Sequence, residues 1–508
     1  MSLRVDGVGK RPVVQIVMSR WLRLAGRLLR VPVARVRAGG DGIPMTVAEP
    51  TTDGSYRDKI VAVEPGGNEF IAEADRHGKP HQLFWTWTSP NLEFATIFVG
   101  MLAILLFQQT FWQAVAGIFI GTGLGAIAHY FLSARGPLHG VPQMVLGRMA
   151  FGFKGNAVPA VLMSVTAGVG WFATNSVSGA FALSTLFGFG PLLGLVIIVL
   201  LQTGFAFFGH NLVQAFERWS FPVLAVIFGV ASVAIFMHAD FSSSSAAQGG
   251  GGLGGFLLTV GASFGYAAGW TPYAADYTRY LPSTVSTART GLFASAGLFL
   301  SCFVLEVVGA AAVTTGEASL ADPTGSFTSE LASPLAKATL LAIAIGAIAA
   351  NSINIYSGAM AFVTIGIKLP AHVARALVTV FFGVAGFLIA WWALPDAAHS
   401  YEAFLLIIAY WIGPWLGVVF ADQYLRRGQK IAGFLYDRSY ANWNGLLSFM
   451  FGLVVSVLLF CNQEYFQGYL VKAVPQLGDI TFFIGFVLAG GGYLLLCRSK
   501  IAAERLKA

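Results

Sequence analysis

The chain is dominated by apolar stretches that are long enough to cross a lipid bilayer. A membrane-spanning helix needs roughly 20 mostly apolar residues, and stretches of about this length recur along most of the sequence. Hydrophobic residues make up 56% of the 508 residues and charged residues only 11%, whereas soluble domains average about 25% charged residues. The sequence therefore predicts an all-α membrane protein and argues against an ordinary soluble enzyme.

We predict about twelve membrane-spanning helices. They are 84–107, 112–133, 157–186, 190–208, 219–238, 253–275, 290–315, 335–366, 376–395, 401–421, 443–461 and 480–497. They define a transmembrane domain over 84–497, an N-terminal tail over 1–83 and a C-terminal tail over 498–508. Residues 1–44 are rich in arginine, and we expect a start codon assigned too early rather than a basic surface helix on anionic lipid.

The basic residues fall in every second loop between the predicted spans. The loop after the second span carries Arg135, Arg148 and Lys154, for example, whereas the loops on the other side are acidic or nearly uncharged. Lys and Arg accumulate on the cytoplasmic side of membrane proteins. We therefore expect a multi-pass protein of the plasma (inner) membrane with both termini in the cytoplasm. The net charge of +7 is explained by this orientation signal and not by nucleic-acid binding.

The sequence lacks the motifs of several membrane-protein classes. It contains no Walker loop and no HExxH motif, and Cys302, Cys461 and Cys497 have no metal-ligand spacing. We expect no metal, no bound cofactor and no enzymatic activity. Channels, receptors and secondary transporters remain, but no charged ring or filter sequence suggests a channel. The absence of a large polar domain argues against a receptor.

Two acidic residues fall inside predicted spans. Glu93 lies in the first span and Glu306 in the seventh, and ionisable groups at such depth mark candidate functional sites. Each is a candidate for proton binding, and each could instead be a structural carboxyl that is hydrogen-bonded to a neighbouring helix. We weigh the two readings evenly for Glu93 and prefer the structural one for Glu306.

The first and sixth predicted spans carry helix-breaking residues at corresponding positions. Ser89-Pro90-Asn91 precedes the apolar part of the first span, and Gly265, Gly269 and Pro272 interrupt the sixth. In transporters built from two inverted five-helix repeats, broken helices of this kind surround a binding site near the membrane midplane. The glycines could instead form a close-packing helix face, and both readings can hold.

Aromatic and amide side chains lie together in two other spans. Trp171 and Asn175 are four residues apart in the third span and share one face of a helix. An indole offers a stacking plane and an amide offers a donor and an acceptor, which suits a flat heterocycle. Asn351, Ser352 and Asn354 make the eighth span unusually polar. These amides must contact a cargo or a neighbouring helix, because unpaired polar groups are costly in hydrocarbon.

These motifs together resemble the nucleobase:cation symporter-1 family. The stretches at 136–155, 170–180, 269–282 and 351–358 match the family signatures in order, and 63–91 is similar to the purine–cytosine permease branch. The resemblance covers roughly residues 60 to 500. It implies a leucine-transporter-like fold of two inverted five-helix repeats plus two helices. It also implies a nucleobase or related heterocycle as cargo, taken up with H⁺ or Na⁺ by alternating access.

The resemblance assigns roles to particular residues. Trp171 would stack on the cargo, Asn175 would bind its edge, and Trp270 would cover its other face. In some relatives the stacking aromatic lies earlier in the sixth helix, so Phe264 and Tyr266 are further candidates. The polar cluster of the eighth helix corresponds to Asn351 and Asn354; some relatives have two adjacent asparagines where this chain has Ala350-Asn351.

The resemblance also bears on the coupling ion. Sodium-coupled members use hydroxyl groups just before the eighth-helix asparagine, where this chain has only apolar residues at 347–350. We therefore expect H⁺ rather than Na⁺, with Glu93 as the first candidate for the proton carrier. If the alignment is displaced by one turn, Ser352 could bind a cation.

Three charged residues in the signature stretches have another predicted role. Asp276, Arg279 and Arg148 are expected to be ion-pair or gate residues at the cytoplasmic ends of helices. The predicted function is import of cytosine or purines. Allantoin, hydantoin, uracil or thiamine as cargo, or base binding without transport, are the alternatives. The sequence does not define the oligomeric state.

Overall fold

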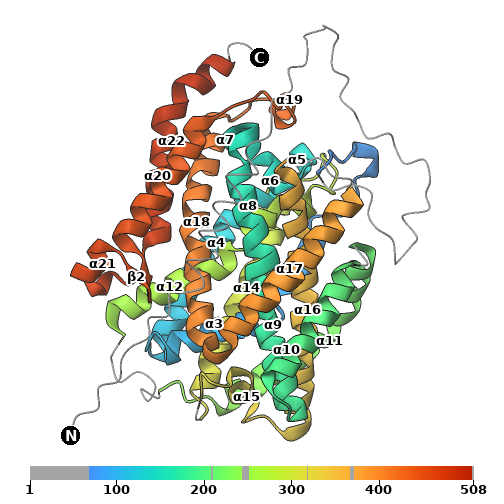
Figure 1. Cartoon of the computed structure of the whole chain (residues 1–508), viewed down its shortest axis with the longest axis vertical. Coiled ribbons are helices and arrows are strands. Elements are labelled where there is room, and N and C mark those ends of the chain that lie inside the picture. Colours follow the sequence, from blue (N-terminus) through green and yellow to red (C-terminus); the bar gives the residue numbers. More distant parts are fainter. Residues whose placement is uncertain (1–67, 208–209, 243–250, 317, 367–370, 506–508) are drawn as a thin grey trace, which may run out of the picture. The chain divides into compact units, whose positions relative to one another are not determined.

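The computed structural model describes residues 68–207, 210–242, 251–316, 318–366 and 371–505 (Figure 1). The described chain is almost entirely helical, and its strands form one short hairpin, β1 (Asn462–Gln463) with β2 (Phe466–Gln467). The all-α prediction is confirmed. The expectation for residues 1–44 lies outside the described residues.

The first predicted span is a broken helix. It consists of α2 (Gln82–Thr88), a 3₁₀ turn η2 (Ser89–Asn91) and α3 (Phe94–Leu105), and the two parts are bent by 62°. Pro90 has no N–H to donate, so the helix cannot continue unchanged through it. Glu93 then adopts an extended conformation (φ −144°, ψ 164°) before α3 begins. The break predicted from the sequence is confirmed.

The sixth predicted span is also interrupted. Helix α12 (Gly252–Ala268) ends at Gly269, and η4 (Thr271–Tyr273) and α13 (Ala274–Thr278) follow. Pro272 opens the 3₁₀ turn, where its missing N–H costs nothing. The two breaks therefore occur in the first helix of each half of the chain, as in a fold of inverted repeats.

The third predicted span contains a local widening. It runs through α8 (Ala157–Val165), a π-helical turn η3 (Thr166–Trp171) and α9 (Phe172–Phe187). Turns of this type are rare and occur frequently at functional sites. Before this span, the signature stretch 136–155 folds into three short helices, which are α5 (Gly136–His139), α6 (Gln143–Leu146) and α7 (Arg148–Gly155).

Every other predicted span corresponds to a helix. These helices are α4 (Phe111–Ser133), α10 (Pro191–Phe207), α11 (His210–His238), α14 (Thr287–Val313), α16 (Ser333–Thr364), α17 (Ala371–Ala393), α18 (Ala397–Leu425), α20 (Trp443–Phe460) and α22 (Thr481–Arg505). The shorter connecting elements are η1 (Glu73–Asp75), α15 (Pro323–Thr328), η5 (Leu394–Asp396), α19 (Ala432–Leu435), α21 (Tyr469–Ala473) and η6 (Pro475–Leu477). Helix α22 extends beyond residue 497, where the C-terminal tail was expected to begin.

The number of spans stays a prediction. Within the described residues, eight helices are long and apolar enough to cross a membrane, or nine when the bent first span counts as one. One of the eight, Leu377–Leu425, contains both α17 and α18. Helices α10 and α12 are not among the eight, because each is only 17 residues long. Twelve spans agree with these helices, because each predicted stretch has its own helical segment.

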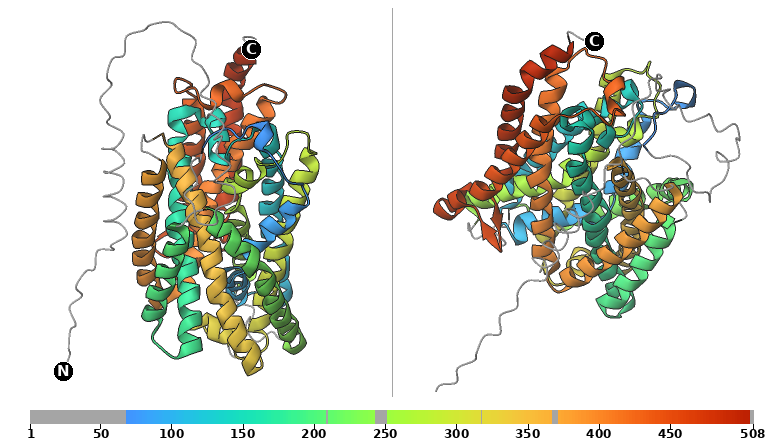
Figure 2. Two further views of the ribbon diagram at one scale, coloured as in Figure 1. Left: turned by 90° about the vertical axis from the view of Figure 1, so that its right-hand side faces the viewer. Right: turned by 45° about the horizontal axis from the view of Figure 1, so that its top comes forward.

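The helices pack in two groups that both halves of the chain supply. One group, the four-helix bundle, contains α3 and α4 from the first half and α12 and α14 from the second. The other group contains α9 and α10 together with α16 and α17. Helices α18, α20 and α22 contact one another and run side by side along one edge (Figures 1 and 2). Interdigitation of the two halves is expected for inverted repeats.

Glycine allows the closest helix contact in the four-helix bundle. A Cβ atom on Gly100 of α3 would lie 1.6 Å from the carbonyl oxygen of Glu306 on α14. No side-chain rotation can relieve a clash with backbone. Such small-residue contacts stabilise helix pairs in membranes, where lipid removes the hydrophobic drive for association.

We therefore expect Gly100→Ala to separate α3 from α14 and to destabilise the protein by about 2 kcal/mol or more, as overpacking does. Thermal aggregation of the detergent-solubilised protein, followed by size-exclusion chromatography, measures the loss. Gly229→Ala on α11 is the matched control, because a Cβ there meets no atom within 4 Å. Equal melting temperatures for the two variants would contradict the close contact.

Candidate functional site

The predicted cargo residues meet where the two groups of helices face each other. Trp171 ends the π-helical turn of the third span and is buried. A Cβ atom on Gly269, at the break of the sixth span, would lie 3.1 Å from its indole ring. The ring is held edge-on by Tyr266, at 5.2 Å between centroids, and by Phe404, at 5.1 Å. The indole therefore lies against the break itself.

Trp270 lies at the same break and turns toward other aromatic rings. Its ring contacts Trp87 of α2 at 6.1 Å and Tyr273 at 5.1 Å. Its indole Nε1 is buried and has no hydrogen-bond partner in the described structure. A buried donor without a partner is unusual in folded proteins. The sandwich of a cargo between Trp171 and Trp270 stays a prediction.

Asn175 belongs to a buried amide network between α9, α10 and α16. Its Nδ2 donates to Oδ1 of Asn351 at 3.1 Å, and Nδ2 of Asn351 donates to Oε1 of Gln202 at 2.7 Å and to the carbonyl of Phe172 at 3.0 Å. Gln202 in turn donates to Ser176. The network fixes the third span against the eighth. The Oδ1 atom of Asn175 has no partner in the described structure, so one acceptor remains available beside Trp171.

Asn354 joins the eighth span to the sixth. Its Oδ1 accepts a hydrogen bond from the hydroxyl of Tyr273 at 2.9 Å, and both residues are buried. Asn351 and Asn354 lie on one side of α16, but they contact different helices. Their polarity is accounted for by contacts between helices, which the sequence left open.

The two aromatic candidates in the sixth span point in different directions. Phe264 stacks on Phe482 of α22, with centroids 4.3 Å apart. Tyr266 contacts Trp171 and is fully buried. Of the two, Tyr266 is therefore the one that contacts Trp171, and a cargo contact of either residue stays a prediction. Residues two apart on a helix point to different faces, so a shift of two positions changes the neighbour completely.

Glu93 lies at the first break and is connected to the aromatic pair. The hydroxyl of Tyr266 donates to Oε1 of Glu93 at 3.0 Å and lies 2.5 Å from the hydroxyl of Thr96. Glu93 is 2% exposed. One tyrosine therefore connects the buried carboxyl of Glu93, the predicted proton site, to the indole of Trp171.

The eighth span offers no hydroxyl ligand beside the first break. A Cβ atom on Gly346 would lie 2.9 Å from the carbonyl oxygen of Leu92, so α16 runs directly past the break. The next residues on α16, 347–350, are buried and apolar. The hydroxyl of Ser352 donates to the carbonyl of Ile348 in its own helix at 2.9 Å. Among the described residues, no group of three or more His, Cys, Asp or Glu side chains could hold a metal ion.

The three predicted gate residues tie the short signature helices to the transporter core. Oδ1 of Asp276 accepts from the backbone N–H of Gln143 at 2.9 Å. Arg148 donates to the carbonyls of Leu435 and Thr364, both at 3.0 Å. Burial lowers the pKa of Arg148 to about 10, so it stays charged at neutral pH.

Arg279 also contacts residues outside its own helix. Its Nη2 donates to the hydroxyl of Tyr280 at 3.0 Å and contacts the sulfur of Met360 on α16 at 3.7 Å. Asp276, Arg279 and Arg148 thus lie between elements and away from the amide network, in agreement with a gate or structural role. That role stays a prediction.

Sequence reasoning missed three buried groups around the site. Gln202 completes the amide network, and Tyr273 binds Asn354. His129 is fully buried, and the centroid of its ring lies 4.1 Å from that of Trp87. Gln202 could have been found as an amide within the apolar run LVIIVLLQTGF. The hydrogen bond of Tyr273 to Asn354 and the ring contact of His129 with Trp87 join distant parts of the chain, so the sequence alone does not show them.

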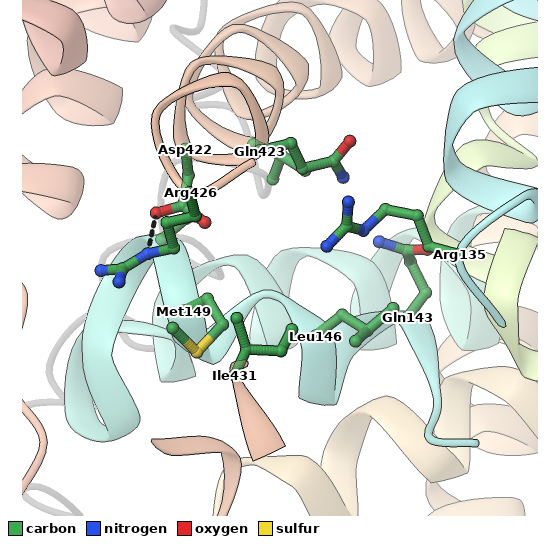
Figure 3. A pocket seen from close by; sticks show the side chains of 10 residues that line it. Arg135, Gln143, Leu146, Met149, Asp422, Gln423, Arg426 and Ile431 are labelled. Atoms are coloured by element: carbon green, nitrogen blue, oxygen red, sulfur yellow. Dashed lines mark hydrogen bonds and ion pairs between the residues drawn. The ribbon is translucent and has the colours of Figure 1, made fainter. Parts of the chain in front are cut away.

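A separate pocket lies at the α5–α7 end of the helices. It is lined by Arg135, Gln143, Asp422 and Arg426 together with apolar side chains (Figure 3). Arg426 Nε is 2.7 Å from Asp422 Oδ1. None of the predicted cargo residues lines this pocket. The pocket is therefore separate from the predicted cargo residues.

Comparison with known proteins agrees with this geometry. A solved structure of Mhp1, a nucleobase-cation-symport-1 family transporter in a closed conformation with bromovinylhydantoin bound, has the same fold (TM-score 0.67) at 18% identity. The match covers 87% of this chain and 97% of Mhp1. A putative purine-cytosine permease of Bacillus subtilis (strain 168) is 27% identical over 446 residues, which cover 85% of this chain and 95% of the relative. A purine-cytosine permease of Emericella nidulans is 28% identical over 439 residues, which cover 81% of this chain and 83% of that permease.

Two broken helices in opposite halves of the chain are the arrangement of a membrane transporter built from inverted repeats. The predicted leucine-transporter-like architecture is confirmed by the Mhp1 fold. The family model for permeases of cytosine/purines, uracil, thiamine and allantoin matches residues 70–485. The chain belongs to this family, and the bacterial and fungal relatives above carry the name purine-cytosine permease.

Proposed function

We propose that this permease imports cytosine or a purine together with a proton. The observation that carries the proposal is the arrangement around Trp171. The flat indole of Trp171 lies at the break that carries the unpaired donor Trp270 Nε1, and Asn175, whose Oδ1 is an unpaired acceptor, follows Trp171 by one helical turn. A nucleobase offers a face for stacking and an edge with both donors and acceptors. The names of the bacterial and fungal relatives support the same cargo.

Proton coupling is supported by the polar groups at the first break. Glu93 is buried and bonded to Tyr266, which contacts Trp171. The neighbouring stretch 347–350 of α16 is apolar, and Ser352 is bonded within its own helix. A hard cation such as Na⁺ needs several oxygen ligands. A carboxyl that binds and releases a proton is the better match.

The transport cycle follows from the two groups of helices. Cargo and proton bind between the four-helix bundle and the group formed by α9, α10, α16 and α17. Movement of one group against the other then closes one side of the site and opens the other. We assign the α5–α7 end to the cytoplasm, because the basic loops gather there and Lys and Arg favour that side. Residence in the plasma (inner) membrane with both termini cytoplasmic belongs to the same proposal.

Uptake of labelled cytosine by cells that lack their own nucleobase carriers tests the cargo. We expect saturable uptake that unlabelled adenine, hypoxanthine and cytosine inhibit and that allantoin and thiamine do not. Inhibition by allantoin or thiamine alone would contradict the cargo assignment. Binding of cytosine without accumulation would identify a receptor instead.

Asn175→Ala tests the edge contact. We expect the affinity for the best cargo to fall by about 3- to 10-fold, the value of one hydrogen bond. The ranking of competing bases should change with it, because a base that does not use this acceptor loses nothing. Inhibition constants of a panel of bases measure the effect.

Ser178→Ala is the control for Asn175→Ala, since Ser178 is on the same helix and bonds only to the carbonyl of Thr174 in the described structure. If Asn175→Ala left both affinity and ranking intact, the third-span site would be wrong.

A further inference from the structure

A second buried carboxyl lies inside the four-helix bundle. Glu306 is on α14 and has no exposed surface. Its Oε2 accepts a hydrogen bond from the hydroxyl of Thr122 on α4 at 3.3 Å. The hydroxyl of Ser263 on α12 lies beside the carboxyl as well, and neither that hydroxyl nor Oε1 has any other partner in the described structure. Glu306 therefore joins three helices of the bundle through hydroxyl groups alone.

Among the described residues, no cation balances this carboxyl. The helices α3, α4 and α12 beside it contain no Lys or Arg, and no described basic side chain forms an ion pair with Glu306. An isolated carboxylate in hydrocarbon or protein interior is very costly. The surroundings of Glu306 therefore suit the uncharged acid better than the carboxylate.

The hydroxyl partners suit both protonation states. A serine or threonine hydroxyl can donate to a carboxylate and, after rotation, accept from a carboxylic acid. A salt bridge or a backbone amide would hold the charged form only. Thr122 and Ser263 can therefore follow the loss and return of the proton without movement of a helix.

One helix connects the surroundings of Glu306 and Glu93. Ser263 of α12 lies beside the Glu306 carboxyl. Tyr266 of α12 is bonded to Glu93 and lies one turn after Ser263. Helix α12 therefore contacts both carboxyls through hydroxyl groups that are one turn apart.

We propose that Glu306 is a second proton-binding residue of the transport cycle and that it shares the transported proton with Glu93. The proton leaves one carboxyl and binds the other carboxylate, and no other bond changes. This inference rests on the proposed proton coupling. It adds Glu306, inside the four-helix bundle, as a proton site besides Glu93, which lies at the first break and is bonded to Tyr266 beside Trp171.

Glu306→Gln tests the inference, since glutamine has the shape of the protonated acid and cannot release a proton. In proteoliposomes with an imposed pH gradient of one unit, we expect the variant to lose the accumulation of cytosine that the wild type shows. Exchange of internal for external cytosine, which needs no net proton transfer, should stay within about twofold of wild type. Val304→Ala, on the lipid-facing side of the same helix, is the control and should accumulate normally.

The outcomes separate this inference from the proposed function. Wild-type accumulation without response to pH would remove proton coupling itself. Wild-type accumulation that responds to pH, together with equal accumulation by Glu306→Gln, would overturn the second proton site and leave Glu93 as the carrier.

A second variant keeps the test valid if Glu306→Gln does not fold. Thr122→Val retains the carboxyl and removes one of its hydroxyl partners. We expect it to displace the pH profile of uptake by about half a unit or more, since hydrogen bonds to one protonation state change a proton affinity by this order. An unchanged pH profile would overturn the inference.

Discussion

Replacing Trp171 by alanine is expected to weaken the binding of every transported base by about 10- to 100-fold. Base stacking on an aromatic side chain contributes about 1–3 kcal/mol and depends little on which base is stacked. Trp171 is 3% exposed and lies against the break of the sixth span, so alanine would remove the stacking plane and leave a cavity. Equilibrium binding of labelled cytosine and hypoxanthine to purified protein measures the loss.

The control for this variant is Trp391→Ala. Trp391 lies on α17 and is 53% exposed on the outer face of the helices. Its replacement should leave binding unchanged. If Trp171→Ala bound one base normally and another weakly, Trp171 would be a specificity residue and not the general stacking plane. If it bound both normally, the cargo site would lie elsewhere.

Replacing Glu93 by glutamine is expected to abolish proton-driven accumulation. With one proton per cargo, a gradient of one pH unit can drive about tenfold accumulation, because one pH unit corresponds to 1.36 kcal/mol. Glutamine can still accept the hydrogen bond from Tyr266, so the local structure should persist. The accumulation ratio should fall from about ten to about one, while exchange of cytosine across the membrane continues.

Glu464→Gln provides the matched control for Glu93→Gln. Glu464 lies in the exposed turn between β1 and β2 and should not affect coupling. Tenfold accumulation by Glu93→Gln would show that Glu93 is structural, which is the alternative that the sequence alone left open.

The fold could be predicted from the sequence because its signals are local. Runs of apolar residues define the helices, and Pro90 and Pro272 define the two breaks without reference to the rest of the chain. The pairing of Trp171 with Asn175 also depends only on the period of one helix. The structure places Trp171 against Tyr266 of the four-helix bundle and Asn175 in the amide network of α9, α10 and α16.

The neighbours of each site residue could not be predicted in the same way. Phe264 and Tyr266 are both aromatic and two positions apart, and only the packing of α12 against α18 and α22 decides which one meets Trp171. Gln202 and Asn351 are 149 residues apart in the chain. His129 and Trp87 belong to different helices, and the sequence does not show that their rings meet.

Imposed ion gradients test the central claim most directly. Purified protein is reconstituted into liposomes, and uptake of labelled cytosine and hypoxanthine is measured with a pH gradient, with a Na⁺ gradient and with neither. The account predicts accumulation above equilibrium with the pH gradient, acidic outside, and simple equilibration in the other two conditions. Accumulation that requires Na⁺ and ignores pH would contradict it, and would mean that oxygen atoms near the first break bind a cation in place of the proton on Glu93.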